Sequence, residues 1–213
     1  MSQIKLKHSG GNSVIIAAPD SNPASDRTLK LPSDGDGTIL TTNSSVGKLL
    51  QVVTNSTQDS SGSLSIGSQS TPVDIPNQSV SITPSATNSK ILVSFHQMGE
   101  TSSGPQIFYF VLKRAISGGA TTSIAGTSSG NRTAVFTQPL RTPDGVDRST
   151  TPEYTHCSGY LDSPNTTSAV TYTVQIGNME GTGTYYYNRS VDDGNYSSRE
   201  RGLSWITVQE IAT

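Results

Sequence analysis

The chain has 213 residues, of which only 31% are hydrophobic and 14% are charged, with a formal net charge of -2. Intrinsic disorder normally combines low hydrophobicity with high net charge, so this near-neutral balance argues against a disordered chain. The 14 basic residues are scattered and are outnumbered by 16 acids, which excludes the basic footprint of a nucleic-acid-binding protein. No run approaches the roughly eighteen apolar residues of a membrane span, so we expect no membrane insertion.

The first 45 or so residues predict short polar strands, "IKLKH", "SVIIAA", "TLKL" and "TIL", separated by Gly, Pro, Asn and Asp turns. In "DRTLKLPSDGDGTILTT", Leu29, Leu31 and Ile39 occupy alternate positions on either side of a turn, which predicts a β-hairpin. A lone hairpin is marginally stable in water, and this one has few apolar side chains to bury. Its open face therefore needs a cover that the hairpin itself does not supply.

From about residue 46 the predicted strands are longer and alternate cleanly. The clearest are "KILVSFHQM", "QIFYFVLKR" and "AVTYTVQIG", each with apolar residues at every second position. Further strands are predicted at "SVSITP", "TAVFTQPL", "YTHCSGYL", "GTYYYN" and "LSWITVQEIA". Roughly eight strands spaced by turns indicate a β-sandwich or jelly roll. The fold class is therefore all-β, with a short N-terminal module at 1–45 and a sandwich at 46–213, and the Ser-rich tract 54–70 is interpreted as a loop.

Few residues could support catalysis. His8, His96 and His156 lie in three separate predicted strands without metal-ligand spacing. His156 is adjacent to Cys157, but neighbouring strand residues point to opposite faces, so the pair cannot act as a thiol-imidazole couple. Cys157 is the single cysteine, so it has no partner for an internal disulfide. We predict no catalytic residue, no cofactor and no metal site.

The segment "GTYYYNRSVDDGNYSSRERG", residues 183–202, is the remaining candidate for recognition. Alternation along a strand places Tyr185 and Tyr187 on one face and Tyr186 on the other, so at least one face presents aromatic rings. Aromatic rings beside Asn, Asp and Arg suit sugars, because the rings pack on C-H faces while hydroxyls form hydrogen bonds. The alternative is that the tyrosines fill a sheet face or a subunit interface. The predicted contact residues are Tyr185, Tyr187, Arg189, Asp192, Asp193, Tyr196, Arg199 and Arg201.

The N-terminal sequence "GGNSVIIAAPDSNPASDRTLKLPSDGDGTILTT" resembles short modules of tail fibres and other virion structural proteins of marine tailed phages, such as cyanophages. In those modules an Ala-Pro step precedes an Arg-Thr-Leu-x-Leu-Pro run and a Gly-Thr-Ile strand. Residues 46–213, with "VGKLLQVV", "ITPSATNSKILVSF", "YLDSPNTTSAVTYTVQ", "YYYNRS" and "WITVQEIA", are similar to the domain that often follows. These motifs are structural, and no catalytic residue carries over.

The resemblance implies a homotrimeric virion component, with residues 1–45 nearest the other virion proteins and the larger domain outermost. A trimer could bury Leu29, Leu31 and Ile39 on its axis, so that the N-terminal module is intertwined or prism-like. In the alternative, the hairpin packs on the sandwich of its own chain. The N-terminus lacks the apolar core of a signal peptide, so we expect synthesis in the bacterial host cytoplasm and a final location in the virion.

Three functions are compatible with these residues. The first is a non-enzymatic tail fibre or appendage subunit that contacts a host-surface glycan or protein. The second is a head fibre or a capsid decoration protein. The third, a polysaccharide depolymerase, needs two carboxylates facing each other across a cleft, whereas Asp192 and Asp193 are adjacent and cannot flank a bond. We therefore expect that the chain is not an enzyme.

Overall fold

A computed structural model of the chain describes residues 3–7, 9–11, 13–17, 47–69, 71–102, 107–138 and 151–213. Within this part every regular element is a β-strand, and the chain divides into two compact units, Met1–Asn43 and Ser44–Thr213. The strands are β1 Gln3–Lys7, β2 Ser13–Ala17, β3 Leu49–Thr57, β4 Ser63–Ile66, β5 Val73–Ile82, β6 Lys90–Thr101, β7 Phe108–Ile116, β8 Thr121–Ile124, β9 Glu153–Asp162, β10 Val170–Asn178, β11 Gly183–Tyr187 and β12 Ser204–Ile211.

The first unit contains an antiparallel hairpin of β1 and β2, whose register runs from Gln3 opposite Ala17 to Lys7 opposite Ser13. Two of the four short strands predicted from the sequence are therefore confirmed. The side chains of Ile4 and Leu6 are 63% and 59% exposed, so the hairpin does not bury them within this unit. The predicted inter-chain contact residues lie outside the described residues: Leu29, Leu31 and Ile39.

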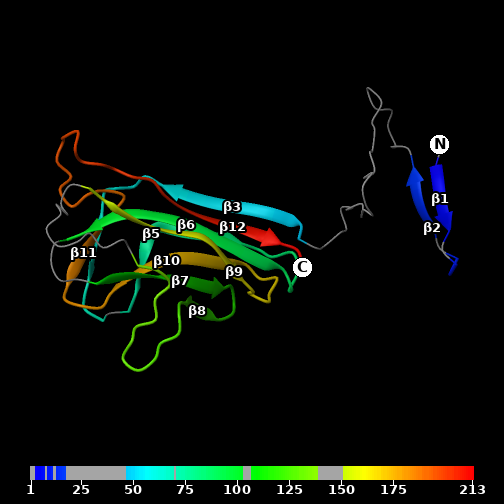
Figure 1. The fold of residues 1–213 in the computed structure, drawn as a ribbon, viewed down its shortest axis with the longest axis horizontal. Helices are drawn as coiled ribbons and strands as arrows, with labels where there is room; N and C mark the ends of the chain where they lie inside the picture. The colour runs from blue at the N-terminus through cyan, green and yellow to red at the C-terminus, as the bar shows by residue number, and fades with distance from the viewer. Residues whose placement is uncertain are drawn as a thin grey trace, which may run out of the picture. The chain divides into compact units, whose positions relative to one another are not determined.

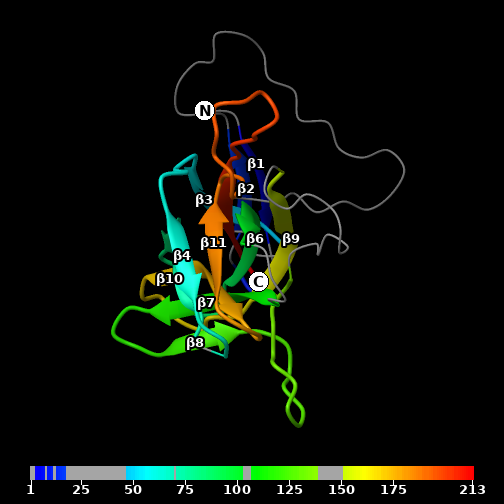
Figure 2. The same cartoon turned by 90° about the vertical axis from the view of Figure 1, so that its left-hand side faces the viewer.

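The second unit is a two-layer antiparallel sandwich, which confirms the predicted fold class (Figure 1). One layer is a four-stranded sheet in the order β5-β10-β7-β8. The other is a six-stranded sheet in which β3, β12, β6, β11 and β4 follow one another and β9 also pairs with β6. Figure 2 shows the unit from its end, with β4 and β11 close to the viewer. Long sequence separations between paired strands mean that this sheet forms only when distant segments meet.

The core lies between the two sheets and is made by the faces that alternation predicts. On β6, Phe95 and its inward-facing neighbours are at most 1% exposed, and on β10 Tyr172 is fully buried. The inward residues on these strands and on β7 are Ile91, Val93, Phe95, Phe108, Phe110, Leu112, Val170, Tyr172, Val174 and Ile176. On β6 and β10 most outward neighbours are polar or partly exposed, which is typical of sandwich strands with one buried face. On β7 the outward neighbours Tyr109 and Val111 are also buried, at 5% and 4% exposure.

Two local predictions are wrong. The tract 54–70 is not a loop throughout, because it contains the end of β3 and all of β4. Ile66 of β4 is 1% exposed, and the strand pairs with β11, so a distant partner induces a strand that the local Ser-rich composition conceals. In the described part of "TAVFTQPL", Thr137 makes only an isolated bridge to Phe110. No helix in the described part of the chain is long and apolar enough to cross a membrane.

A buried ion pair joins the two sheets. Asp162, at the end of β9, accepts hydrogen bonds from Nη1 of Arg114 on β7 at 2.7 and 2.9 Å. It also accepts a bond of 2.7 Å from the hydroxyl of Tyr172 on β10. Burial, followed by the bond to Asp162, raises the pKa of Tyr172, so the phenol stays protonated as a donor. The hydrogen bonds among these three side chains link the two sheets and form what we call the clamp.

Candidate functional site

The segment from Asn188 to Gly202 forms a closed loop after β11. Its base is a backbone hydrogen bond of 2.8 Å from the amide of Gly202 to the carbonyl of Asn188. Asn188 has a left-handed backbone with φ of 58°, a conformation in which Asn is enriched among residues with side chains. Its side-chain amide donates to the carbonyls of Thr57 and Asp59, at 3.3 and 2.8 Å, and its side-chain oxygen accepts from the hydroxyl of Ser204. One buried residue thus ties the loop to β3 and β12.

The first turn of the 188–202 loop is held by buried polar groups. Oε2 of Glu100, a residue that is 2% exposed on β6, accepts a hydrogen bond of 2.7 Å from the amide of Val191. The hydroxyl of Ser190, which is fully buried, donates to the carbonyl of Asp192 at 2.9 Å. Oδ1 of Asp192 accepts from the amide of Gly194 at 3.0 Å, which forms an Asx turn. The loop backbone therefore has specific hydrogen-bond partners on both sides of its charged segment.

The charges of the loop pair with one another. Arg201 donates from Nε and Nη2 to the two oxygens of Asp193, at 2.9 and 2.6 Å, in a bidentate fork. Arg199 donates from Nε and Nη2 to one oxygen of Asp192, at 2.9 and 2.8 Å. The hydrogen bond from Arg201 holds the pKa of Asp193 below its usual value. Since both aspartates are engaged by arginines, the loop offers a shaped, internally neutralised surface and not a strongly charged one.

Two arginines of the loop lie over tyrosine rings. The Cζ atom of Arg189 is 4.5 Å from the ring centroid of Tyr186, and that of Arg199 is 5.6 Å from the centroid of Tyr196. Both distances are within the range of a cation-π contact. Tyr196 remains 69% exposed, the highest value among the exposed large hydrophobic side chains in the described part. Arg199 therefore supports from one side an aromatic ring that is otherwise open to solvent.

The structure corrects the position of two predicted contact residues. Tyr185 and Tyr187 are only 3% and 8% exposed and belong to the core of the sandwich. The ring of Tyr185 meets that of Phe110 edge to face at 6.0 Å, and its hydroxyl accepts a hydrogen bond of 3.2 Å from Gln97. Because β11 is paired with β4 on one edge and β6 on the other, its inner face closes the end of the core. These two tyrosines fill a sheet face, which was the alternative interpretation from the sequence.

The 188–202 loop lies at the end of the sandwich opposite to the point where the chain enters it. At the entry, the amide of Gly47 donates to the carbonyl of Ala212 at 3.1 Å, just before β3 begins. At the other end of β3, the carbonyl of Thr57 accepts from Asn188. A strand of nine residues at about 3.3 Å per residue separates the two points by about 30 Å. Figure 1 shows the loop, in orange, far from the C-terminus.

The outer face of the six-stranded sheet carries an aromatic and apolar cluster. His96 on β6 is directly opposite Trp205 on β12 and His156 on β9. The His96 ring lies 5.6 Å from that of Tyr154 and 6.4 Å from that of Trp205. Partial burial, with a contribution from His156, lowers the pKa of His96, so this ring is mostly neutral at neutral pH. The exposed members of this face include Val52, Tyr154 and Leu161, at 53%, 49% and 55%.

Among the residues that the structure describes, no three His, Cys, Asp or Glu side chains lie close enough together to hold a metal ion. His156 is exposed, whereas Cys157 packs against the core, so the prediction that these neighbours point to opposite faces is confirmed. Burial raises the pKa of Cys157, which makes its thiol a poor nucleophile at neutral pH. The pairing of His96 with His156 could not be found from sequence spacing, because sixty residues separate them in the chain.

Comparison with known proteins adds little to this description. No protein-family model and no curated protein matches the sequence. Among solved structures, the chain is similar to that of the infectious bursal disease virus Gx strain, with a TM-score of 0.38 and 15% identity over 95% of this chain and 44% of the other. It is also similar to the T13 particle of the same virus, with a TM-score of 0.37 and 13% identity over 95% and 42%.

The chain spans less than half of the length of those viral chains. TM-scores this low do not establish a shared fold, so these matches carry no weight in the function proposed below. The described residues define an all-β protein whose antiparallel sandwich presents, at one end, a loop with its charged side chains paired to one another.

Proposed function

We propose that the chain is a non-enzymatic structural protein of a phage virion, a tail fibre or appendage subunit that contacts the host surface through the 188–202 loop. The virion assignment is supported by the resemblance of both sequence segments to phage fibre proteins. The contact assignment is supported by one observation above all. The loop and Gly47, where the described part of the sandwich unit begins, lie at opposite ends of β3, so a particle that holds this unit near Gly47 would leave the loop at its far end.

The loop has the features of a recognition surface. Exposed aromatic and arginine side chains contribute most to binding energy at protein surfaces. Tyr196 is exposed on a backbone that is already ordered, so binding would cost little additional conformational entropy. A host glycan or a host protein is the partner that we propose for it.

Adsorption experiments with single-residue variants test this contact. Virions carrying Tyr196→Ala should bind host cells more weakly by about 1–3 kcal/mol, the usual range for truncation of an aromatic contact residue. Tyr196→Phe is the matched control, because it keeps the ring and should adsorb nearly as well as the native virion. Normal adsorption of both variants, with the protein present in the particle, would contradict the assignment.

We also propose that the chain is a homotrimer, with Leu29, Leu31 and Ile39 in the inter-chain contact and residues 1–45 bound to other virion proteins. The low hydrophobic content and the short N-terminal strands support this assembly. Leu31→Asp should dissociate the N-terminal part while the sandwich stays folded. Sedimentation that gives a folded monomer at micromolar concentration refutes the trimer. Cross-links from the C-terminal strand to other virion proteins would reverse the proposed polarity.

A head fibre or a capsid decoration protein is the alternative within the same class. Copy number in purified virions distinguishes the two, because decoration of the shell requires far more chains per particle than a set of tail fibres. Electron cryomicroscopy of the intact particle would locate the chain directly. A depolymerase is disfavoured by the site itself, since Asp192 and Asp193 are both engaged by arginines.

A further inference from the structure

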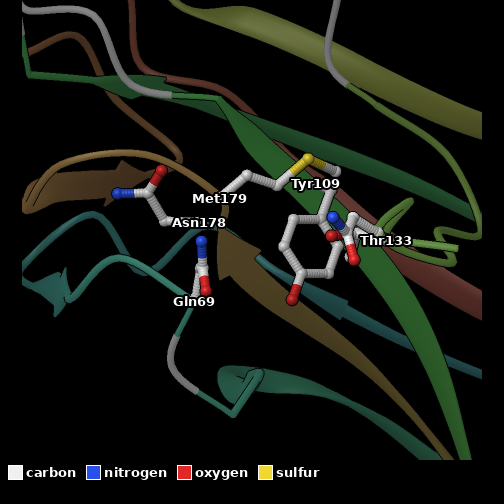
Figure 3. A pocket seen from close by; sticks show the side chains of 6 residues that line it. Gln69, Tyr109, Thr133, Asn178 and Met179 are labelled. Atoms are coloured by element: carbon white, nitrogen blue, oxygen red, sulfur yellow. The ribbon is translucent and has the colours of Figure 1, made fainter.

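A pocket with a volume of about 420 Å³ opens at the end of the four-stranded sheet where β7 begins and β10 ends (Figure 3). The residues that line it are Gln69, Tyr109, Asn131, Thr133, Asn178 and Met179. They come from four separate parts of the chain, and none of them carries a charge. The volume is within the range of about 300–1,000 Å³ that is usual for small-molecule sites.

Tyr109 forms the buried wall of this pocket. It is 5% exposed and is directly opposite Gly177 in the register of β7 and β10. A Cβ atom at position 177 would lie 2.3 Å from Cζ of Tyr109, so the ring occupies the space that a side chain there would need. Burial raises the pKa of Tyr109, and its hydroxyl therefore stays protonated, able to donate and to accept a hydrogen bond. The glycine lets the ring lie against the sheet.

The rim of the pocket is pre-organised. Gln69 has a left-handed backbone with φ of 52°, an uncommon conformation for a residue with a long side chain. Its amide donates to the carbonyl of Asn178 at 2.7 Å, and the hydroxyl of Ser68 donates to the carbonyl of Met179 at 3.1 Å. The side-chain amide of Asn178 is itself bound to the carbonyl of Ile66 at 3.3 Å. Backbone strain of this kind persists where the surroundings over-determine it, and it is concentrated at functional sites.

The polar groups around the pocket have spare hydrogen-bonding capacity. Among the described residues, the side chains of Gln69, Asn131 and Thr133 and the hydroxyl of Tyr109 have no hydrogen-bond partner. Two carboxamides and two hydroxyls provide both donors and acceptors, which match the vicinal hydroxyls of a sugar ring. The thioether of Met179 and the Tyr109 ring supply an apolar wall for its C-H groups. A phosphate or carboxylate ligand would find no cation here.

We propose that this pocket binds one unit of a neutral saccharide. The site lies at the same end of the sandwich as the start of β11, which pairs with the end of β6, so it belongs to the part of the unit that is remote from the chain entry. The proposal does not depend on the 188–202 loop or on the position of the chain in a virion. If the pocket binds no saccharide, the proposed function of the 188–202 loop still stands. If the loop does not contact the host, the saccharide proposal still stands.

Saturation-transfer NMR on the full-length protein tests the pocket with defined probes. The neutral probes are the methyl glycosides of glucose, galactose, mannose and N-acetylglucosamine, and the charged probes are glucuronate and N-acetylneuraminate. At least one neutral glycoside should receive saturation, and neither charged sugar should. A blocked neutral dipeptide is the third arm, and saturation of that peptide in place of the sugars would overturn the saccharide assignment.

Variants then locate the binding site. Gln69→Gly removes the side chain and tolerates the left-handed backbone, and together with Asn131→Ala it should weaken binding of the responding glycoside by about tenfold or more, because two hydrogen bonds are lost. Tyr109→Phe removes one hydroxyl and should weaken binding by about three- to tenfold. Thr121→Val, at an exposed position on β8 of the same sheet, is the control and should leave affinity unchanged. No response to any neutral glycoside, or an unchanged affinity in the pocket variants, would overturn the proposal.

Discussion

Replacing Asp162 by alanine should lower the free energy of unfolding of the sandwich by about 3 kcal/mol. The carboxylate is 5% exposed and accepts hydrogen bonds from Arg114 and Tyr172, so its removal leaves a buried cation and a buried hydroxyl without their partner. Removal of one member of a buried ion pair typically costs about 3–5 kcal/mol. The Arg114 side chain keeps 18% of its exposure and can recover some hydration, which favours the lower end of that range.

Tyr172→Phe in the same cluster should cost about 1.5 kcal/mol. A hydrogen bond to a charged group contributes about 1.5–3 kcal/mol, and Asp162 would still be bound by Arg114 after the hydroxyl is removed. In the Asp162→Ala background the hydroxyl has already lost its acceptor. There, Tyr172→Phe should cost nothing or should stabilise the protein, so the coupling energy between the two sites is about 1.5 kcal/mol or more.

Urea unfolding of the four proteins in this double-mutant cycle provides the measurement. Trp205 is the single tryptophan and belongs to β12, so its fluorescence reports on the sandwich. The free energies come from the midpoint and the slope of each transition, and the slope should be the same in all four proteins. An equal cost of Tyr172→Phe in both backgrounds, or a cost below about 1 kcal/mol for Asp162→Ala, would refute the clamp.

Three further outcomes follow from the described contacts. Tyr187→Ala should lower the free energy of unfolding by about 3–5 kcal/mol, because this side chain is only 8% exposed. Tyr196→Ala should change it by less than about 0.5 kcal/mol, because that side chain is 69% exposed. Similar melting temperatures for the two variants would contradict the buried position of Tyr187. Burial alone would raise the pKa of Glu210, but hydrogen bonds from Gln51 and Ser85 outweigh it and hold the pKa below 4.5. Its carboxylate therefore stabilises the fold above about pH 4.5, and this contribution is lost as the pH falls through the folded pKa. Glu210→Gln should flatten the acid side of the stability curve, and an unchanged slope would exclude this role. Asn188→Ala should raise the hydrogen-exchange rate of the loop amides without unfolding the sheets, and unchanged protection there would show that the loop does not need this residue.

Alternation along the sequence predicted the central strands well, because each has one face that must be apolar. In β6 and β10, apolar residues at every second position correspond to side chains such as Phe95 and Tyr172 that are almost fully buried. The same reasoning placed Tyr185 and Tyr187 on one face of β11. It could not decide whether that face points into the core, because a one-residue shift of register exchanges the two faces of a strand.

The missed features depend on contacts between distant segments. β4 contains only Leu64 and Ile66 as apolar residues in a Ser- and Gly-rich tract, and it becomes a strand by pairing with β11. The predicted strand "TAVFTQPL" fails for the opposite reason. Phe136 is of a residue type that is common in strands, but it does not belong to a strand of either sheet. Its ring packs between those of Phe95 and Tyr160, at centroid distances of 5.8 and 5.6 Å. Neither outcome is encoded in local composition.

The pocket could be found only in three dimensions. Gln69, Asn131 and Asn178 are ordinary polar residues in a chain rich in them, and no spacing in the sequence links them. The loop at 183–202 was recognisable because charges and aromatics are otherwise sparse. What the sequence could not show is that its aspartates are already paired with its arginines. A cluster of charged residues can be recognised in the sequence, but which aspartate pairs with which arginine depends on the folded structure.

Buried polar side chains explain how a chain with few apolar residues keeps this end of the sandwich ordered. A loop can approach a core only if its backbone groups find hydrogen-bond partners. Asn178 and Asn188 are at most 1% exposed, and each of their side-chain amides donates to two backbone carbonyls, while Glu100 accepts from a loop amide. These bonds replace regular pairing in the irregular segments beside the proposed contact loop and the pocket. Substitution of these residues should therefore disturb recognition before it disturbs the sheets, since the apolar core lies further along the strands.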